Sequence, residues 1–393
     1  MSERRNGTPD VEFGIYLHIP FCVSKCRYCD FLSAPASEES KEDYVRVLLQ
    51  EIKEKAPAYQ NRTVTSVFFG GGTPSILKAG GISSLMDRIR ALFPVSDDAE
   101  ITMECNPGTL TREKLAIYKG CGINRLSMGV QSADNAALKR LGRIHTYEEF
   151  LESYELARKT GFKNINLDLI SGIPSQKEGD YEKSLKKLLR LRPEHLSVYS
   201  LLIEEGTEFH RLYGEDAKTR EQGGVPKHLP DEETERNMVH RTAAILAESG
   251  YHQYEISNYA RNGKESRHNL GYWRRNEYLG LGLGAASLIE NRRFHNTRAL
   301  ADYLKYDFAP QDEEVIDRKG QMEETMFLGL REIRGVEKAE FYRRFGVTMR
   351  NVYGEVIDEM ASKGLLLETE KNVRLSDRGL DVANYVMTAF LLD

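Results

Sequence analysis

Residues 13–29 read FGIYLHIPFCVSKCRYC, a short apolar run followed by three closely spaced cysteines. The apolar run over residues 13–19 predicts a β-strand. The cysteines Cys22, Cys26 and Cys29 follow it within a span of eight residues. The stretch therefore predicts a strand that ends in a tight loop carrying three thiols.

Strand and helix patterns alternate through the first two-thirds of the chain. Short apolar runs are separated by longer stretches with helical periodicity. Such alternation predicts an α/β fold with a parallel sheet and right-handed crossovers, either an open sheet or part of a (β/α) barrel. The further predicted strands are 64–69, 100–104, 123–128, 164–169 and 195–201, and the predicted helices include 41–55, 82–92, 112–119, 147–159 and 181–191.

Unusual motifs recur directly after each predicted strand. In parallel α/β folds the carboxyl ends of the strands form the rim where ligands bind. One such motif is compatible with an ordinary turn, but six in the same position predict a binding rim. The motifs are HIPFC at 18–22, GGGTP at 70–74, ECNPG at 104–108, GVQS at 129–132, DLISGIP at 168–174 and LIEEGT at 202–207.

The composition is that of an ordinary globular protein. The 393 residues are 40% hydrophobic and 29% charged, with a formal net charge of −5 at pH 7. This balance excludes a disordered chain, a collagen and a disulfide scaffold, and it disfavours binding to nucleic acid through a global basic field. No apolar run approaches the ~20 residues that span a bilayer, and the polar first ten residues do not resemble a secretory signal. We therefore expect a cytoplasmic protein that binds no nucleic acid.

The thiol loop predicts metal or redox chemistry more than disulfides. Structural zinc sites usually take four ligands, often as two pairs, and no second pair is present in the sequence. Three thiolates suit a [4Fe–4S] cluster with one iron left open for a small ligand. A zinc loop completed by a distant histidine is the alternative. The remaining cysteines, Cys105 and Cys121, are expected to be buried thiols without a role.

The pattern changes in the last third of the chain. Residues 231–249 have the pattern of one helix, and 364–375 that of a hairpin among helices. Helices followed by a small hairpin indicate a winged-helix-like module, although its mixed charges give DNA binding little support. We expect a short polar tail over 1–12, a core barrel over 13–225, a sheet extension and connecting segment over 226–296, and a mostly helical, winged-helix-like domain over 297–393.

Cys22-x3-Cys26-x2-Cys29, with the aromatic Tyr28 before the last cysteine, resembles the signature of the radical S-adenosylmethionine (SAM) superfamily. The resemblance implies a partial (β/α)6 TIM-like barrel whose three thiolates hold a [4Fe–4S] cluster. It also implies that the amino and carboxylate groups of SAM chelate the open iron. Reduction of the cluster would then split SAM to a 5′-deoxyadenosyl radical, with the protein supplying placement.

The ordered rim motifs are similar to those of oxygen-independent coproporphyrinogen III oxidase and its relatives, and residues 324–346 and 375–386 are similar to their C-terminal domain. This resemblance implies a SAM pocket. Tyr16 would lie beside SAM near the cluster, and Tyr28 would pack on its adenosyl part. The other implied SAM residues are Gly71, Gly72 and Thr73 near the amino group, and Glu104, Gln131, Arg143 and Asp168 as hydrogen-bonding partners.

Two features depart from the oxidases. Phe31 stands where the oxidases carry a further cysteine, and only about a dozen residues precede the first strand. Both features resemble the HemW-type heme chaperones, as do HNLGYW at 268–273 and YEISNY at 254–259. The resemblance implies that His268 is an axial ligand of heme iron and that Tyr272 and Trp273 stack on the porphyrin. Taken alone, the residues are also compatible with a turn-capping histidine and core aromatics.

Two functions follow from these resemblances. The first is a heme chaperone that carries a [4Fe–4S] cluster with exchangeable SAM and passes heme to an acceptor protein. The alternative is an enzyme, a radical SAM oxidase that decarboxylates coproporphyrinogen III. A different radical SAM reaction on a tetrapyrrole is a third option. The expected partners are heme, its acceptor and an electron donor such as flavodoxin or ferredoxin. A peripheral membrane contact is compatible with heme delivery, although no amphipathic anchor stands out.

Overall fold

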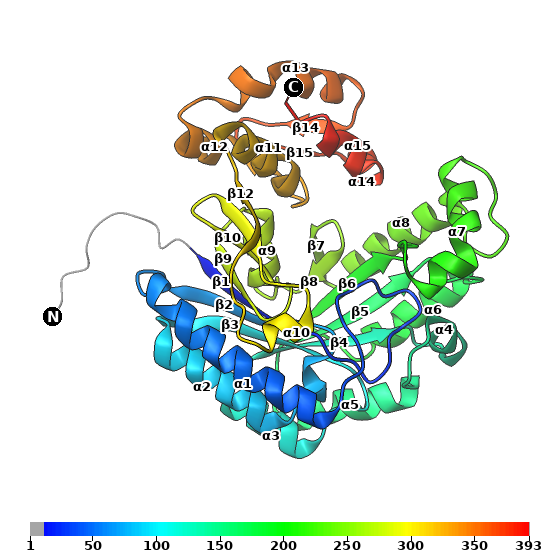
Figure 1. The fold of residues 1–393 in the computed structure, drawn as a ribbon. Helices are drawn as coiled ribbons and strands as arrows, with labels where there is room; N and C mark the ends of the chain where they lie inside the picture. Colours follow the sequence, from blue (N-terminus) through cyan, green and yellow to red (C-terminus); the bar gives the residue numbers. More distant parts are fainter. Residues whose placement is uncertain (1–11, 393) are drawn as a thin grey trace.

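The structure is a computed structural model that describes residues 12–392. The expected polar tail therefore lies outside the described residues, except for Glu12. The chain forms a large curved sheet with helices packed on one side of it. A smaller C-terminal domain lies on the opposite side of the sheet (Figure 1). Among the described residues, no helix is both long and apolar enough to cross a membrane.

Six parallel strands form the centre of the main sheet, as the sequence predicts. They pair in chain order, each with the next, which is the arrangement of a partial (β/α)6 barrel. The strand β3 begins at Val95, earlier than expected, where Val95 pairs with Val64 of β2. The strand β4 begins at Arg125, later than expected, because the side chain of Asn124 bonds the backbone of Ala99 and Ile101 ahead of the ladder. The six strands are β1 (Phe13–Ile19), β2 (Val64–Gly71), β3 (Val95–Cys105), β4 (Arg125–Gln131), β5 (Ile165–Ser171) and β6 (His195–Ser200).

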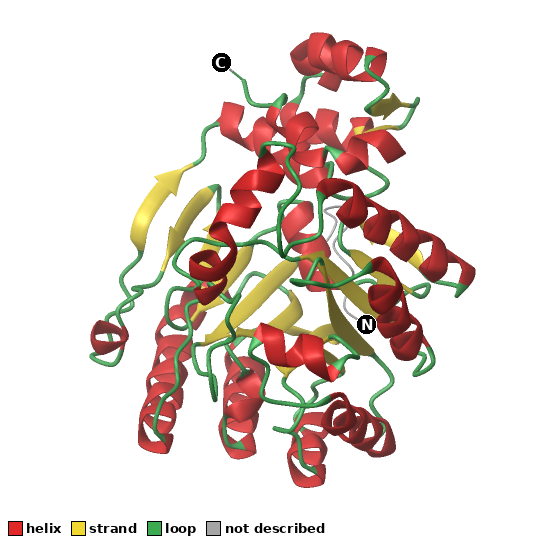
Figure 2. Cartoon of the chain, turned by 90° about the vertical axis from the view of Figure 1, so that its right-hand side faces the viewer, coloured by secondary structure: helices red, strands yellow, loops and turns green. Residues whose placement is uncertain are grey.

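Helices cover the outer face of the six strands (Figures 1 and 2). The apolar stripes of most of these helices pack into one core with the outward-facing strand residues, as Tyr44 and Leu48 of α1 illustrate, whereas Leu141 of α4 and Phe209 of α7 belong to a smaller separate cluster. Hydroxyl caps start several of these helices, including a capping box at Thr146 and Glu149. The helices are α1 (Glu38–Lys55), α2 (Ala79–Leu92), α3 (Arg112–Gly120), α4 (Asn135–Leu141), α5 (Tyr147–Thr160), α6 (Glu178–Leu189), α7 (Glu208–Glu221) and α8 (Glu232–Glu248), with short 3-10 helices η1 (Ala56–Tyr59) and η2 (Pro74–Ile76).

Shorter strands extend both edges of the parallel sheet. On one edge β9 (Tyr278–Leu281) pairs with β1, followed by β10 (Ala286–Ile289), β11 (Arg292–His295) and β12 (Gln311–Val315). On the other edge β8 (Asn258–Ala260) and β7 (His252–Glu255) follow β6. The domain boundaries expected at 225/226 and 296/297 stay predictions. The helix α8 packs on α6 of the barrel, and the main sheet continues to Val315. Two short helices, α9 (Arg267–Trp273) and α10 (Leu300–Tyr303), lie within this extension.

The C-terminal domain begins with α11 and has its own apolar core. Phe341, Tyr353 and Phe390 are buried at its centre. The hairpin expected at 364–375 is present and pairs with a third short strand. Helices with this small sheet form the predicted winged-helix-like module. Its elements are α11 (Arg318–Gly329), β13 (Val336–Glu337), α12 (Lys338–Phe345), α13 (Met349–Ser362), β14 (Leu366–Glu368), β15 (Asn372–Leu375), α14 (Asp377–Asp381) and α15 (Ala383–Thr388).

Candidate functional site

The three-cysteine loop is held at its base by the strand beside it. The Gly72 amide donates to Ile19 O at 2.8 Å, and the Thr73 amide donates to Phe21 O at 2.8 Å. A Cβ atom on Gly72 would lie 2.6 Å from Phe21 O, so only glycine allows this close approach. The GGGTP motif after β2 therefore acts as a cradle that fixes where the thiol loop leaves β1.

All three thiols of the loop are free and half-buried. The Cys29 amide donates to Cys26 O at 3.2 Å and closes the second half of the loop. Arg143 Nη1 lies 3.4 Å from Cys26 Sγ, and Thr73 Oγ1 lies 3.6 Å from Cys22 Sγ. Polar donors from the loops after α4 and β2 therefore face the sulfur atoms, which is an environment that favours a thiolate.

The donor set fits an iron–sulfur cluster better than a single ion. In residues 12–392, no three or more His, Cys, Asp or Glu side chains are grouped to hold one metal ion. A zinc ion would need its ligands about 2.0–2.3 Å away in a tetrahedron. A [4Fe–4S] cluster takes each thiolate on a different iron, so sulfurs spread along a loop can all bind it. Three cysteines would leave the fourth iron without a protein ligand.

Two carboxyl groups face the interior of the barrel below this loop. Glu104, at the end of β3, accepts a hydrogen bond from the Gly71 amide at 3.2 Å. Asp168, on β5, accepts one from Asn166 Nδ2 at 2.7 Å. Burial and then the charge of Asp168 raise the pKa of Glu104 to about 8, and burial raises the pKa of Asp168. The pair is suited to a cationic ligand, because a positive charge between the strands would relieve the cost of ionising both groups.

Arg143 joins the carboxyl ends of three strands. Its Nη2 donates to Asn106 Oδ1 and to Gly129 O, both at 2.7 Å. Asn106 Nδ2 in turn donates to Thr73 Oγ1 at 2.9 Å. The buried Nε of Arg143 has no partner among the described residues, so a donor stays available for a ligand. A guanidinium in this place suits a carboxylate, which is the role expected for it.

Three further residues expected at the SAM site, Gln131, Tyr28 and Tyr16, lie near Arg143 or the cysteine loop. Gln131 ends β4 with a φ of 63°, which turns the chain away from the sheet at the rim. The ring of Tyr28 packs against Phe209 of α7, with ring centroids 6.4 Å apart. Tyr16 Oη lies 3.1 Å from His18 Nδ1, while His18 Nε2 is hydrogen-bonded to Leu32 O at 2.9 Å. Tyr16 thus bonds to a histidine that anchors the far end of the thiol loop.

Tyr199 also faces this interior, and it was missed from the sequence. It lies on β6 with 42% of its surface exposed, although the pKa of its phenol is raised by burial and by Asp168. Its inward direction follows the alternation of His195 and Ser197 along the same strand. This two-residue alternation of polar side chains along the strand was the sequence signal that could have placed Tyr199 inside the barrel.

We expect the affinity of the cluster-loaded protein for SAM to rise between pH 6 and pH 8 and to level off above. The pKa of Glu104 is raised to about 8, so this carboxyl is mostly neutral below that pH. It must lose its proton before its negative charge can attract the cationic part of SAM. Calorimetry in buffers of different ionisation heat would detect the released proton. Glu104→Gln is the matched control, and it should bind SAM more weakly with a flatter pH profile. An unchanged profile in Glu104→Gln would rule out this role for Glu104.

The residues expected to bind heme lie at the other end of the barrel. His268 is buried, with Nδ1 2.9 Å from Ser66 Oγ and Nε2 3.0 Å from Tyr272 Oη. Burial, and secondarily Arg125, lowers the pKa of His268 to about 3. The ring of Trp273 lies under the guanidinium of Arg331, 4.3 Å away. The cavity beside His268 and Tyr272 has room for about one water molecule. Heme ligation by these residues stays a prediction, and it would require a ring nitrogen of His268 to leave its present partner.

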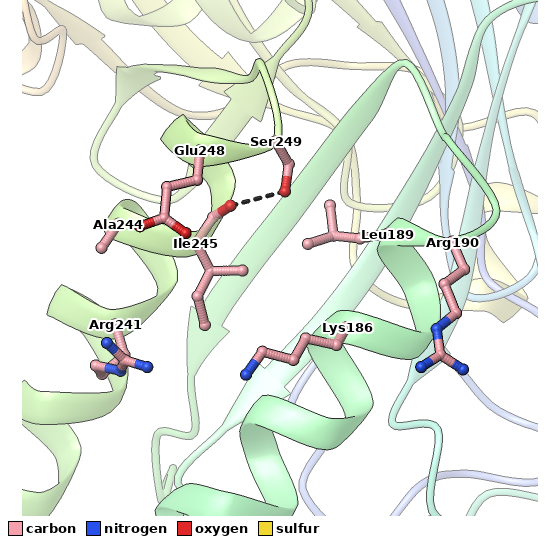
Figure 3. Close-up of a pocket in the computed structure, with 8 residues that line it drawn as sticks. All are labelled: Lys186, Leu189, Arg190, Arg241, Ala244, Ile245, Glu248 and Ser249. Atoms are coloured by element: carbon pink, nitrogen blue, oxygen red, sulfur yellow. Dashed lines mark hydrogen bonds between the residues drawn. The ribbon is translucent and has the colours of Figure 1, made fainter.

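An open groove of about 450 Å³ lies between α6 and α8 (Figure 3). Lys186 and Arg241 border it, and each forms an ion pair with Glu182. Since α6 follows β5 and precedes β6, its last turn lies near the amino ends of the strands. The groove shares no residue with the thiol rim.

Comparison with known proteins identifies the class. Residues 16–188 match the radical SAM superfamily, and residues 316–382 match the HemN C-terminal domain. The chain is similar to the structure of coproporphyrinogen III oxidase (HemN) from Escherichia coli, with a TM-score of 0.82 and 24% identity over 98% of this chain and 91% of that one. At this identity the likeness establishes the fold, which is that of a radical SAM protein.

The family follows from closer relatives. The chain is 38% identical to a protein named heme chaperone HemW from Bacillus subtilis (strain 168), over 96% of this chain and 98% of that one. It is 35% identical to the protein of the same name from Escherichia coli (strain K12), again over 96% and 98%. The chain therefore belongs to the HemW family of heme chaperones.

Proposed function

We propose that this protein binds heme and transfers it to an acceptor protein, and that its barrel carries a [4Fe–4S] cluster with exchangeable SAM. The observation that carries the proposal is the similarity to heme chaperones over nearly the whole chain, which includes both the barrel and the C-terminal domain. The free thiols on the loop after β1 and the buried carboxyl pair beneath them support the cofactor part.

The residues of the rim have separate tasks in this proposal. Cys22, Cys26 and Cys29 hold the cluster, which when bound supplies an electron to SAM. Arg143 binds the SAM carboxylate with its free donor, while the backbone of Gly71 and Gly72 allows the amino group to approach. The other SAM contacts come from Glu104 and Asp168 on the cationic side, and from Tyr16, Tyr28, Thr73 and Gln131 around them.

The oxidase reaction has no observation in its favour. The likeness to HemN concerns the fold alone. Phe31, which stands where the oxidases are expected to carry a further cysteine, is 63% exposed beside the thiols. An exposed phenyl ring can supply neither a ligand nor a proton. The chemistry of that position therefore differs from the one expected of the oxidases.

We expect little or no conversion of coproporphyrinogen III to protoporphyrinogen IX. The assay uses reconstituted protein with SAM and dithionite under anaerobic conditions, with product followed by fluorescence after oxidation. The Cys26→Ala variant gives the background. A cluster-dependent turnover of about 1 per second or more would restore the oxidase function.

The remaining partners are proposals of finer detail. We propose a small electron-transfer protein such as flavodoxin or ferredoxin as reductant, because the exposed Lys25 and Arg27 flank the thiols and offer a docking point for an acidic partner. The peripheral membrane contact and the cytoplasmic location stay predictions.

A further inference from the structure

The helix α9 carries the HNLGYW motif and lies between the barrel and the C-terminal domain (Figure 1). It has only seven residues, so its two ends are about 10 Å apart. Each end makes side-chain contacts with a different body of the protein. These contacts suggest a role for the motif that does not involve heme.

The first end closes the floor of the barrel. Glu100, on β3, accepts hydrogen bonds from the amides of Arg267 at 3.1 Å and His268 at 3.2 Å. The imidazole stacks on Phe68 with centroids 5.1 Å apart and on Tyr16 at 6.4 Å. A Cβ on Gly14 would lie 3.4 Å from the imidazole, so β1 approaches it closely. His268 therefore supports the ring of Tyr16, which is expected to lie beside SAM, from below.

The second end holds the C-terminal domain. The indole of Trp273 lies under Arg331, and Arg274 forms two parallel hydrogen bonds with Glu332, each of 3.1 Å. Arg275 Nε donates to Glu324 of α11 at 2.6 Å, and both side chains are less than 10% exposed. The Arg274–Glu332 pair is bidentate and the Arg275–Glu324 pair is buried, so together they fix α11 and the loop after it to the end of α9.

We propose that α9 is a positioning element that couples the C-terminal domain to the SAM side of the barrel, with His268 as the positioning residue at its inner end. The proposal rests on the proposed SAM site. Displacement of the C-terminal domain would move Trp273 and the following arginines, and the helix α9, which joins them to His268, would carry that movement to Tyr16. By reciprocity, loss of the His268 contacts would loosen the outer end.

The first arm of the test uses the only tryptophan of the chain as its reporter. In cluster-free protein, His268→Ala should shift the emission of Trp273 to the red and increase its quenching by acrylamide. His268→Asn keeps an amide that can face Ser66 and should restore much of the wild-type signal. His228→Ala is the matched control, because the exposed His228 is bonded to Asp216 of α7, far along the chain from α9 and its contacts. If His268→Ala is unstable by thermal melting, Ser66→Ala replaces it.

The second arm measures the dissociation constant of SAM in cluster-loaded protein. Trp273→Ala should raise it by about fivefold, whereas Trp273→Phe, which keeps a ring under Arg331, should stay near the wild type. The coupling requires both arms to respond. An unchanged Trp273 signal in His268→Ala, or an unchanged SAM constant in Trp273→Ala, overturns it. Failure of the wild type to bind SAM would instead contradict the proposed function, and the first arm does not depend on that binding.

Discussion

Cys26→Ala is expected to leave the anaerobically reconstituted protein without most of its iron and without the broad visible absorption of a [4Fe–4S] cluster. The loop supplies three thiols, and no further His, Cys, Asp or Glu in residues 12–392 groups with them to replace a lost ligand. A cluster held by two thiolates would be exposed on the half-buried loop and would be lost. The measurement is an iron and sulfide count together with the visible spectrum.

Cys105→Ala is the matched control for this prediction. Cys105 is buried at the end of β3, where its thiol donates to Met103 O at 3.6 Å. Burial raises the pKa of this thiol and keeps it protonated, so it should not bind iron. Full iron content in Cys26→Ala, or loss of iron in Cys105→Ala, would contradict the assignment of the ligands.

Gly72→Ala is the second substitution with a large expected effect. The added Cβ would lie 2.6 Å from Phe21 O and 2.9 Å from Phe21 N, and both atoms belong to the backbone that starts the thiol loop. Because a backbone cannot rotate aside, the loop must move, at a cost of about 1–3 kcal/mol in the free energy of unfolding. The displaced loop should also hold less cluster. Urea unfolding and the iron count measure the two effects.

Gly80→Ala provides the comparison for Gly72→Ala. Its Cβ would meet no atom within 4 Å, and the residue lies in α2, where alanine is favoured over glycine by up to about 1 kcal/mol. It should unfold at the same or slightly higher urea concentration and keep its cluster. Equal stability of the two variants would show that the close approach at Gly72 is not a constraint on the loop.

The parts of the fold that depend on short sequence patterns could be predicted. The six central strands and the thiol loop follow from apolar runs and from motifs within a few residues of each strand end. The motifs after these strands share one rim, as expected, because a parallel sheet places all carboxyl ends together, and the roles of their polar residues toward SAM stay predictions. Tyr199 lies one step inside that rim and was missed, since its motif begins only after the strand ends.

The parts that depend on contacts between distant segments could not be predicted. Glu100 binds the start of α9 across 168 residues of sequence, and Ser66 reaches His268 across 202. Nothing near His268 in the sequence shows that both ring nitrogens are engaged inside the barrel floor. Likewise β12 joins the main sheet through pairing with β11, so the main sheet continues beyond residue 297, which no local pattern indicated.

The most direct test of the heme-chaperone function is a hemin titration followed by transfer. Hemin added to the purified protein should give a Soret band that saturates at one heme per chain. That band should decay as apomyoglobin, used as a probe acceptor, gains its own spectrum. Cys22→Ala should behave in the same way, because heme is not expected to need the cluster thiols. A wild-type protein that shows no saturable Soret band, or that never releases its heme to the acceptor, would contradict the proposed function.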